Sequence, residues 1–333
     1  MEEIVPEEEE IGSLKAGWEF GNSVFISDTE TVTYFKRGNG ALILTTRQII
    51  KGVERWKNLK MIKFSERPLK SLDIFQREKS VVIVVSDSTG HIRFLSSELK
   101  ILYWLKLPKL SPLRSFSLSS CAPELAGEDA EALESTLDPK EFLTPSFTAV
   151  TTSGCIYNVK NGKPKIVFEG APEGDLKVVA HPFKEVIIVA GKDQLRIMDT
   201  SNTGKFEVRN NLENETITCL NFNKDGAELV VGCQGGAIYQ LDTFSLKILK
   251  KLEPSEHSVI DVIYSTSGLY IATADASHAI TMWERSDTAS NEWKHMGRYR
   301  PHSQDIIQLL FIDEYGTEKL LSLARDRKLV EYM

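Results

Sequence analysis

The segment from Glu256 to Glu284, EHSVIDVIYSTSGLYIATADASHAITMWE, constrains the fold more than any other part of the chain. Between turn residues it holds three short runs in which apolar positions alternate, at 259–264, 270–274 and 279–283. Alternation with a period of two is typical of strands that bury one face. Short turns join such strands as antiparallel neighbours, so the segment predicts a small antiparallel sheet that begins near His257 and ends at Trp283 and Glu284.

Similar groups of short strands occupy most of the chain. We expect seven groups, at 23–64, 69–107, 115–169, 177–209, 216–252, 259–299 and 305–332. The positions that close the last four groups are Asp199, Asp242, Glu284 and Met333, at a spacing of about 45 residues. A steady period of this size indicates an all-β repeat array whose groups each contain four antiparallel strands.

The last group stops after its third strand, so one strand is missing from the count. We expect residues 14–20, which carry Trp18 and Phe20, to supply the outer strand of that group and so close the ring. Such closure ties the two ends of the chain together and removes an open sheet edge. The alternative is that the chain is a fragment or isoform of a longer protein with a second repeat array.

Two acidic segments stand apart from the repeats. Residues 1–10 contain six glutamates and predict a disordered tail, which leaves 11–333 as the folded unit. Residues 122–140 predict an acidic surface insertion between strands. The net charge is −7, and without the tail the chain is close to neutral. A nearly neutral body argues against nucleic acid as a partner, since phosphate binding requires a basic surplus.

No motif for catalysis, a cofactor or a metal is present. The four cysteines lack CxxC spacing and the six histidines are scattered singly, so we predict no metal site. The patterns GxxxxGK[ST], HExxH and GxSxG are missing as well, which favours a protein that is not an enzyme. No apolar run approaches the roughly 20 residues that span a bilayer, and the acidic N-terminus does not fit a secretory signal. We therefore expect an intracellular protein without a membrane partner.

Residues 216–242 and 258–284 resemble WD repeats. In the first, the turn Asn223-Lys224-Asp225-Gly226 stands where the family has Ser-Pro-Asp-Gly, and Asp242 stands at the closing Asp. In the second, His257 and the Trp283-Glu284 pair fall at the family's His and Trp-Asp positions. The resemblance implies a seven-bladed WD-repeat β-propeller with four antiparallel strands in each blade.

The same resemblance assigns a structural role to four polar residues. In WD repeats a His, a Ser or Thr, an Asp and a Trp form a buried hydrogen-bond network within a blade, and the candidates here are His257, Thr273, Asp275 and Trp283. His257 and Asp275 are also residue types that form catalytic pairs in enzymes. The structural interpretation is favoured, because blade architecture alone places a His and an acid at these positions.

The final group, His302 to Tyr332, is similar to a segment of cilia- and flagella-associated WD-repeat proteins, in particular the WD-repeat subunit of the calmodulin- and radial-spoke-associated complex of motile axonemes. This resemblance implies a protein-interaction scaffold in the axoneme. Its expected partners are radial-spoke, calmodulin-containing or doublet-microtubule components. A general intracellular WD-repeat adaptor, for trafficking or ubiquitin ligation, stays open as an alternative, with a propeller enzyme or small-molecule binder as a third.

Three residues are candidates for contacts with a partner. Arg325 and Arg327 lie in the basic cluster Arg325-Asp326-Arg327-Lys328, which fits either an acidic partner or a solvated hairpin turn. Trp56 lies in a stretch, 47–59, that we expect to form a long polar loop, and it fits either an interface anchor or a side chain folded onto its own blade. For Trp104 we expect the second kind of role, in which the ring covers the neighbouring blade.

Overall fold

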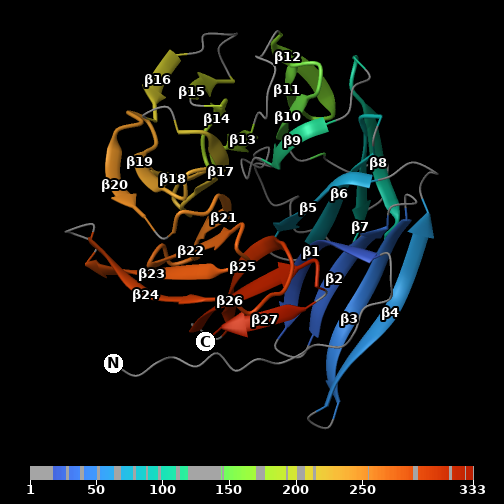
Figure 1. The fold of residues 1–333 in the computed structure, drawn as a ribbon. Helices are drawn as coiled ribbons and strands as arrows, with labels where there is room; N and C mark the ends of the chain where they lie inside the picture. Colours follow the sequence, from blue (N-terminus) through green and yellow to red (C-terminus); the bar gives the residue numbers. More distant parts are fainter. Residues whose placement is uncertain are drawn as a thin grey trace, which may run out of the picture.

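The computed structural model describes residues 18–27, 30–37, 41–50, 53–63, 69–77, 80–87, 89–96, 99–109, 113–118, 144, 146–169, 177–192, 194–200, 207–212, 215–253, 255–287, 292–314, 317–326 and 328–332. Every regular element in these ranges is a β-strand (Figure 1). The strands form six four-stranded sheets and one three-stranded sheet. The all-β prediction is therefore confirmed.

The first three sheets contain the N-terminal strands. Sheet one consists of β1 (Trp18–Ser27), β2 (Glu30–Arg37), β3 (Ala41–Ile50) and β4 (Val53–Lys63). Sheet two consists of β5 (Leu69–Arg77), β6 (Ser80–Asp87), β7 (His91–Ser96) and β8 (Ile101–Lys106). Sheet three consists of β9 (Leu113–Leu118), β10 (Phe147–Thr151), β11 (Ile156–Lys160) and β12 (Lys163–Phe168).

Four further sheets follow in chain order. Sheet four consists of β13 (Lys177–Ala180), β14 (Val186–Ala190), β15 (Gln194–Asp199) and β16 (Glu207–Asn211). Sheet five consists of β17 (Ile217–Phe222), β18 (Glu228–Cys233), β19 (Ile238–Asp242) and β20 (Ile248–Leu252). Sheet six consists of β21 (Val259–Tyr264), β22 (Tyr270–Asp275), β23 (Ile280–Asp287) and β24 (Glu292–Tyr299). Sheet seven consists of β25 (Ile306–Glu314), β26 (Thr317–Ala324) and β27 (Leu329–Tyr332).

Each sheet is an antiparallel meander in which the strands pair in sequence order. From sheet one to sheet seven, the first strand of each sheet lies against the first strand of the next, as β17 does against β21 and β21 against β25. The sheets are arranged around a central axis, with the first strands inside and strands such as β20 and β24 outside (Figure 1). This arrangement gives each sheet two faces to bury against its neighbours.

The structure places residues 18–20 of the predicted closing strand in sheet one, whereas the prediction put them in the last sheet. Trp18 and Phe20 begin β1, where they pair with Arg37 and Phe35 of β2, so they belong to sheet one. A register shift between Phe20 and Asn22 lets β1 continue as one long strand past this point. Residues 14–17 lie outside the described residues, as do the predicted tail at 1–10 and the predicted insertion at 122–140.

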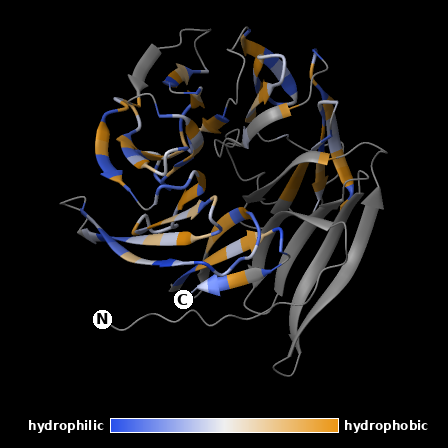
Figure 2. Ribbon diagram, viewed as in Figure 1, coloured by the Kyte–Doolittle hydropathy of each residue, from blue (hydrophilic) through white to orange (hydrophobic). Residues whose placement is uncertain are grey.

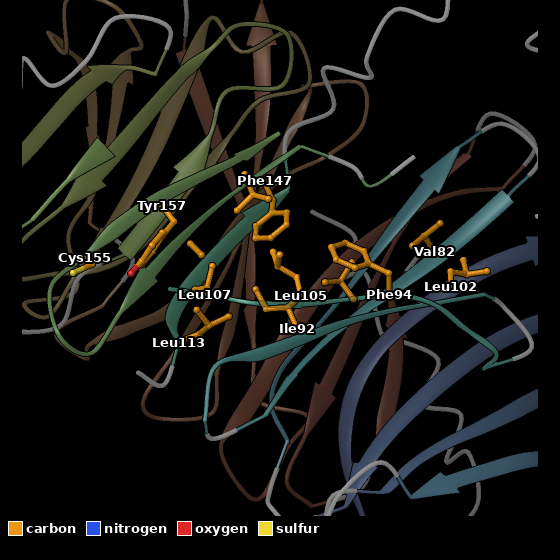
Figure 3. Close-up of a cluster of buried hydrophobic side chains, with 13 residues drawn as sticks. Val82, Ile92, Phe94, Leu102, Leu105, Leu107, Leu113, Phe147, Cys155 and Tyr157 are labelled. Carbon is orange, nitrogen blue, oxygen red and sulfur yellow. The ribbon is translucent and has the colours of Figure 1, made fainter. Parts of the chain in front are cut away.

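The hydrophobic core lies between adjacent sheets. The coloured strands in Figure 2 carry many apolar residues, and inner strands such as β10 and β14 are buried along most of their length. Between sheets two and three, Phe94 packs on Phe147 with the ring centroids 5.9 Å apart, and both side chains are fully buried (Figure 3). Burial of one such ring stabilises the fold by about 2–3 kcal/mol. The sheets are thus held together by side chains that interlock across their faces.

Candidate functional site

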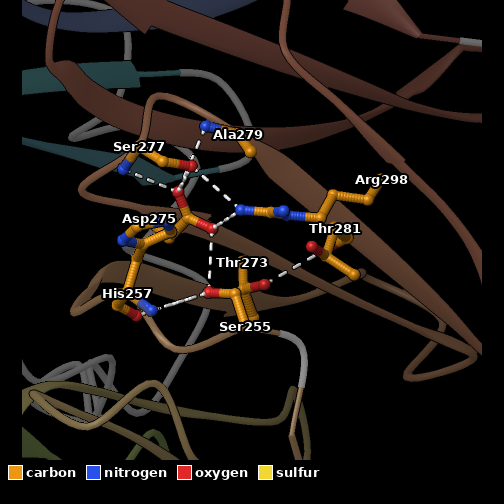
Figure 4. A network of polar contacts seen from close by, with 8 residues as sticks. All are labelled: Ser255, His257, Thr273, Asp275, Ser277, Ala279, Thr281 and Arg298. Atoms are coloured by element: carbon orange, nitrogen blue, oxygen red, sulfur yellow. Dashed lines mark hydrogen bonds and ion pairs between the residues drawn. The ribbon is translucent and has the colours of Figure 1, made fainter.

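Asp275, one of the four predicted network residues, lies at the end of β22 and organises a cluster of hydrogen bonds (Figure 4). Its carboxylate accepts from the Ser277 main-chain N–H at 2.8 Å and from the Ser277 hydroxyl at 2.6 Å. Arg298 Nη2 lies 2.7 Å from the other oxygen, Oδ2. Burial acts to raise the pKa of Asp275, but the hydrogen bonds from Ser277 and Arg298 outweigh it, so the pKa lies below its usual value.

The other three predicted residues do not join this cluster as one network. His257 is exposed, and its main-chain N–H donates to Ser255 Oγ at 3.2 Å. Ser255 Oγ donates in turn to Asp275 at 3.0 Å (Figure 4). Thr273 Oγ1 contacts the Thr281 carbonyl at 3.5 Å. The buried indole nitrogen of Trp283 has no hydrogen-bond partner among the described residues, and the ring packs edge-on against His295 instead.

A network of the predicted composition is present in sheet seven. His302, ahead of β25, has its Nε2 2.6 Å from Ser322 Oγ on β26 and its Nδ1 3.2 Å from the Asp326 carboxylate. Ser322 Oγ lies 3.0 Å from the Tyr332 hydroxyl on β27. Sequence reasoning missed this set, although His302, Ser322, Asp326 and Tyr332 occur in the expected order with Tyr in place of Trp.

Burial controls the ionisation of this network. It lowers the pKa of His302, and the nearby Asp326 only partly opposes that effect. Burial would raise the pKa of Asp326, but hydrogen bonds from the main-chain N–H groups of Ser303 and Lys328 reverse the shift and lower it. A neutral imidazole that is held by an acid and a hydroxyl within one sheet is a structural brace.

A second polar network joins sheets five and six. Glu228 on β18 accepts from Arg285 Nη2 at 2.5 Å and from Gln240 Nε2 at 2.9 Å. The Trp293 indole N–H donates to Gln240 Oε1 at 2.9 Å, and the Arg285 guanidinium lies 4.7 Å from the centroid of the Trp293 ring. Trp293 is only 9% exposed, so it covers the neighbouring sheet.

The predicted interface residues are only partly described. Arg325 is exposed and lies 3.8 Å from the Asp305 carboxylate, while Arg327 is outside the described residues. The predicted loop at 47–59 is wrong, because most of it lies in the paired strands β3 and β4. Trp56 lies on β4, opposite Arg47, and its side chain is not described. Trp104 differs from the prediction: it is 62% exposed on β8, an outer strand, and does not fill the space between sheets.

Three exposed apolar side chains lie in the turn after β19 and at the start of β20. Phe244 is 40% exposed, Ile248 42% and Leu249 44%. Lys184 Nζ lies 4.1 Å from the centroid of the Phe244 ring, and Lys247 is exposed between Phe244 and Ile248. We call Phe244, Lys247, Ile248, Leu249 and Lys250 the hairpin surface. Neighbouring apolar residues at a surface are typical of sites that contact other molecules.

Features that indicate catalysis are missing from the described part of the chain. It holds no group of three or more His, Cys, Asp or Glu side chains that could bind a metal ion. Burial raises the pKa of Cys233 to about 12 and raises that of Cys219 as well, so both thiols stay protonated and unreactive near neutral pH. The described residues contain no helix that is long and apolar enough to cross a membrane.

Comparisons with known proteins add the family context. No family model matches the sequence. The chain is 28% identical over 261 residues to Cilia- and flagella-associated protein 251 of Mus musculus, across 75% of this chain and 20% of the mouse protein. It is 26% identical over 264 residues to the Chlamydomonas reinhardtii protein of the same name, across 75% of this chain and 32% of that protein. The chain therefore spans only a fifth to a third of these relatives.

A solved structure agrees on the architecture. The β-propeller domain of Cps50 (Swd1) from Myceliophteria thermophila superposes with a TM-score of 0.54 at 12% identity, covering 78% of this chain and 88% of that one. The fold is a β-propeller. Together with the sequence relatives, this finding supports a WD-repeat family of cilia-associated proteins. The predicted resemblance to WD-repeat, cilia- and flagella-associated proteins is thus confirmed.

Proposed function

We propose that this β-propeller is a non-catalytic scaffold for protein–protein interaction in the axoneme of the motile cilium or flagellum, near the radial spokes. The similarity to two proteins whose names associate them with cilia and flagella carries the proposal. The described residues also combine rigid sheets with exposed apolar side chains and offer no metal-binding cluster. Such a surface suits the binding of proteins.

The proposed architecture explains why a propeller would serve this role. We take the seven sheets as the seven blades of one ring. Each blade is stiff because its strands are fully paired and its faces are packed, whereas its turns and outer strand are exposed. Several partners can therefore bind one rigid body at the same time, at separate blades.

The proposed partners are radial-spoke, calmodulin-containing or doublet-microtubule components, with neither nucleic acid nor membrane among them. Arg325 and Arg327, with Trp56, remain candidate contacts for such partners. Arg325 suits an acidic partner because its side chain is 70% exposed and its ion pair with Asp305 is long.

The test is to express the tagged chain in ciliated cells and to isolate axonemes. We expect the chain to be retained in demembranated axonemes and to be purified with spoke and calmodulin-containing proteins. Recovery in the cell body with ligase or coat subunits would overturn the axonemal assignment. Replacement of Arg325 and Arg327 by Glu is expected to reduce the recovery of partners, and unchanged recovery at low salt removes these residues from the interface.

A further inference from the structure

The hairpin surface combines apolar exposure with positive charge on one outer strand. Ile248 and Leu249 are consecutive residues of β20, yet both are exposed. Consecutive residues of a regular strand point to opposite faces. Here Leu241 pairs with Ile248 and Gln240 pairs with Lys250, which leaves Leu249 as an extra, bulged residue. The bulge is the reason that two adjacent aliphatic side chains reach the surface.

Lysines accompany these apolar residues. Lys247 and Lys250 flank Ile248 and Leu249, and neither forms an ion pair within the described residues. The Asp242 carboxylate lies near Lys247 and offsets one charge, while Lys251 is paired with Glu253 at 2.9 Å. Lys184 extends the positive charge over the Phe244 ring. The hairpin surface therefore has a positive balance next to exposed apolar side chains.

These features define the chemistry of an occupant. Apolar side chains are needed to cover Phe244, Ile248 and Leu249, and carboxylates are needed to pair with Lys247 and Lys250. β20 is the edge strand of sheet five and lies on the outside of the ring (Figure 1), so a narrow segment matches it better than a broad protein face. The bulge at Leu249 interrupts the free edge of β20, which disfavours the addition of another strand through its main chain.

We infer that the hairpin surface binds an acidic segment of a partner protein whose apolar side chains contact Phe244, Ile248 and Leu249 while its carboxylates pair with Lys247 and Lys250. The inference rests on the proposed scaffold function and names the chemistry of one partner. Binding depends on side-chain contacts, and the main-chain hydrogen bonds between β19 and β20 are the same with and without the partner segment.

The first test uses a fluorescent synthetic peptide of alternating leucine and glutamate, titrated with the full chain and followed by anisotropy. We expect saturable binding that weakens by about tenfold or more in Ile248→Ser/Leu249→Ser and in Lys247→Glu/Lys250→Glu. Binding should also weaken as sodium chloride rises from about 50 mM to about 300 mM. A matched control, Leu269→Ser/Lys294→Glu, changes an exposed apolar residue and an exposed lysine elsewhere and should bind as the wild type does.

Three outcomes overturn the inference. The first is no saturable binding of the leucine-glutamate peptide by the wild type. The second is equal binding by both hairpin variants and the wild type. The third is equal binding of a serine-glutamate peptide, which would show attraction by charge alone. Thermal melting of each variant must match the wild type; Lys247, Ile248 and Leu249 are exposed and Lys250 is half-buried, so folding should be unaffected.

The second test separates this inference from the proposed function. Axonemes are prepared from cells that express either the wild type or Ile248→Ser/Leu249→Ser. Loss of at least one co-purified protein in the variant alone supports the hairpin surface. Identical partners for the two chains overturn the hairpin surface but leave the scaffold function in place. Failure of the wild type to enter axonemes overturns the proposed location, and the peptide titration then decides the surface by itself.

Discussion

His302 Nε2 and Ser322 Oγ lie 2.6 Å apart in the interior of sheet seven, and Ser322 Oγ is also 3.0 Å from the Tyr332 hydroxyl. This chain of contacts links the segment before β25 to β26 and β27. Sheet seven has only three described strands, so it has fewer ladder hydrogen bonds than its neighbours. The buried side chains therefore hold together the sheet that main-chain pairing supports least.

Replacement of Ser322 by Ala is expected to lower the free energy of unfolding by about 1–3 kcal/mol, because His302 Nε2 and the Tyr332 hydroxyl both lose a buried partner. Chemical denaturation measures the change. Ser303→Ala is the matched control, since Ser303 is exposed and contributes its main-chain N–H to Asp326. Equal stability of the two variants would show that the buried contact contributes little.

The same network predicts a pH dependence. Burial holds the pKa of His302 below its usual value of 6.5, so below pH 6.5 the unfolded chain takes up the proton before the folded chain does. Stability that is present above pH 6.5 is then lost as the pH falls toward the folded pKa. One such group contributes a slope of up to about 1.4 kcal/mol per pH unit. The pKa of buried His181 is also lowered, so its effect has the same sign.

The measurement is the free energy of unfolding between about pH 5 and pH 7, for the wild type and for His302→Asn. The variant lacks this titrating group, and its stability should fall less steeply toward acid pH. A variant with the same slope as the wild type would show that His302 is not the group responsible.

Glu228→Gln is expected to destabilise the protein by about 2–3 kcal/mol, because it leaves the Arg285 guanidinium without its carboxylate between sheets five and six. The side chains of Arg285 and Glu228 are only 12% and 18% exposed, so water screens the pair weakly. A double-mutant cycle with Arg285→Met tests the origin of the loss. We expect the second substitution to cost less in the Glu228→Gln background than in the wild type, and strict additivity would argue against the pairing.

Two glycines with positive φ should respond differently to alanine. Gly236 has φ +92°, and an added Cβ would lie 1.9 Å from the Ser255 carbonyl oxygen, which is main chain and cannot swing away. Gly268 has φ +74° with open space around the added atom. Gly268→Ala should cost about 1–2 kcal/mol from backbone strain alone, and Gly236→Ala should cost clearly more. Thermal melting compares them, and equal shifts would contradict the close contact.

The candidate site was harder to predict than the fold. The pattern of residues in 256–284 predicted the strands β21 to β23 closely, since burial of one face requires the alternation that the sequence displays. It did not predict that Trp283 would pack on His295 while the compact network formed around His302. Which hydroxyl reaches which imidazole depends on rotamers and on the registers of three strands, and a pattern of residue types contains neither.

The sequence alone determined the all-β character, the succession of strand groups and the resemblance to WD repeats, because alternation and turn chemistry are local properties of the chain. Only the tertiary structure decided that Trp18 and Phe20 pair with β2, that Trp104 is exposed and Trp293 buried, and that Ile248 and Leu249 emerge together at a bulge. Each of these depends on which strand lies beside which and on how neighbouring sheets face each other. Those relationships join residues far apart in the chain, so no local pattern fixes them.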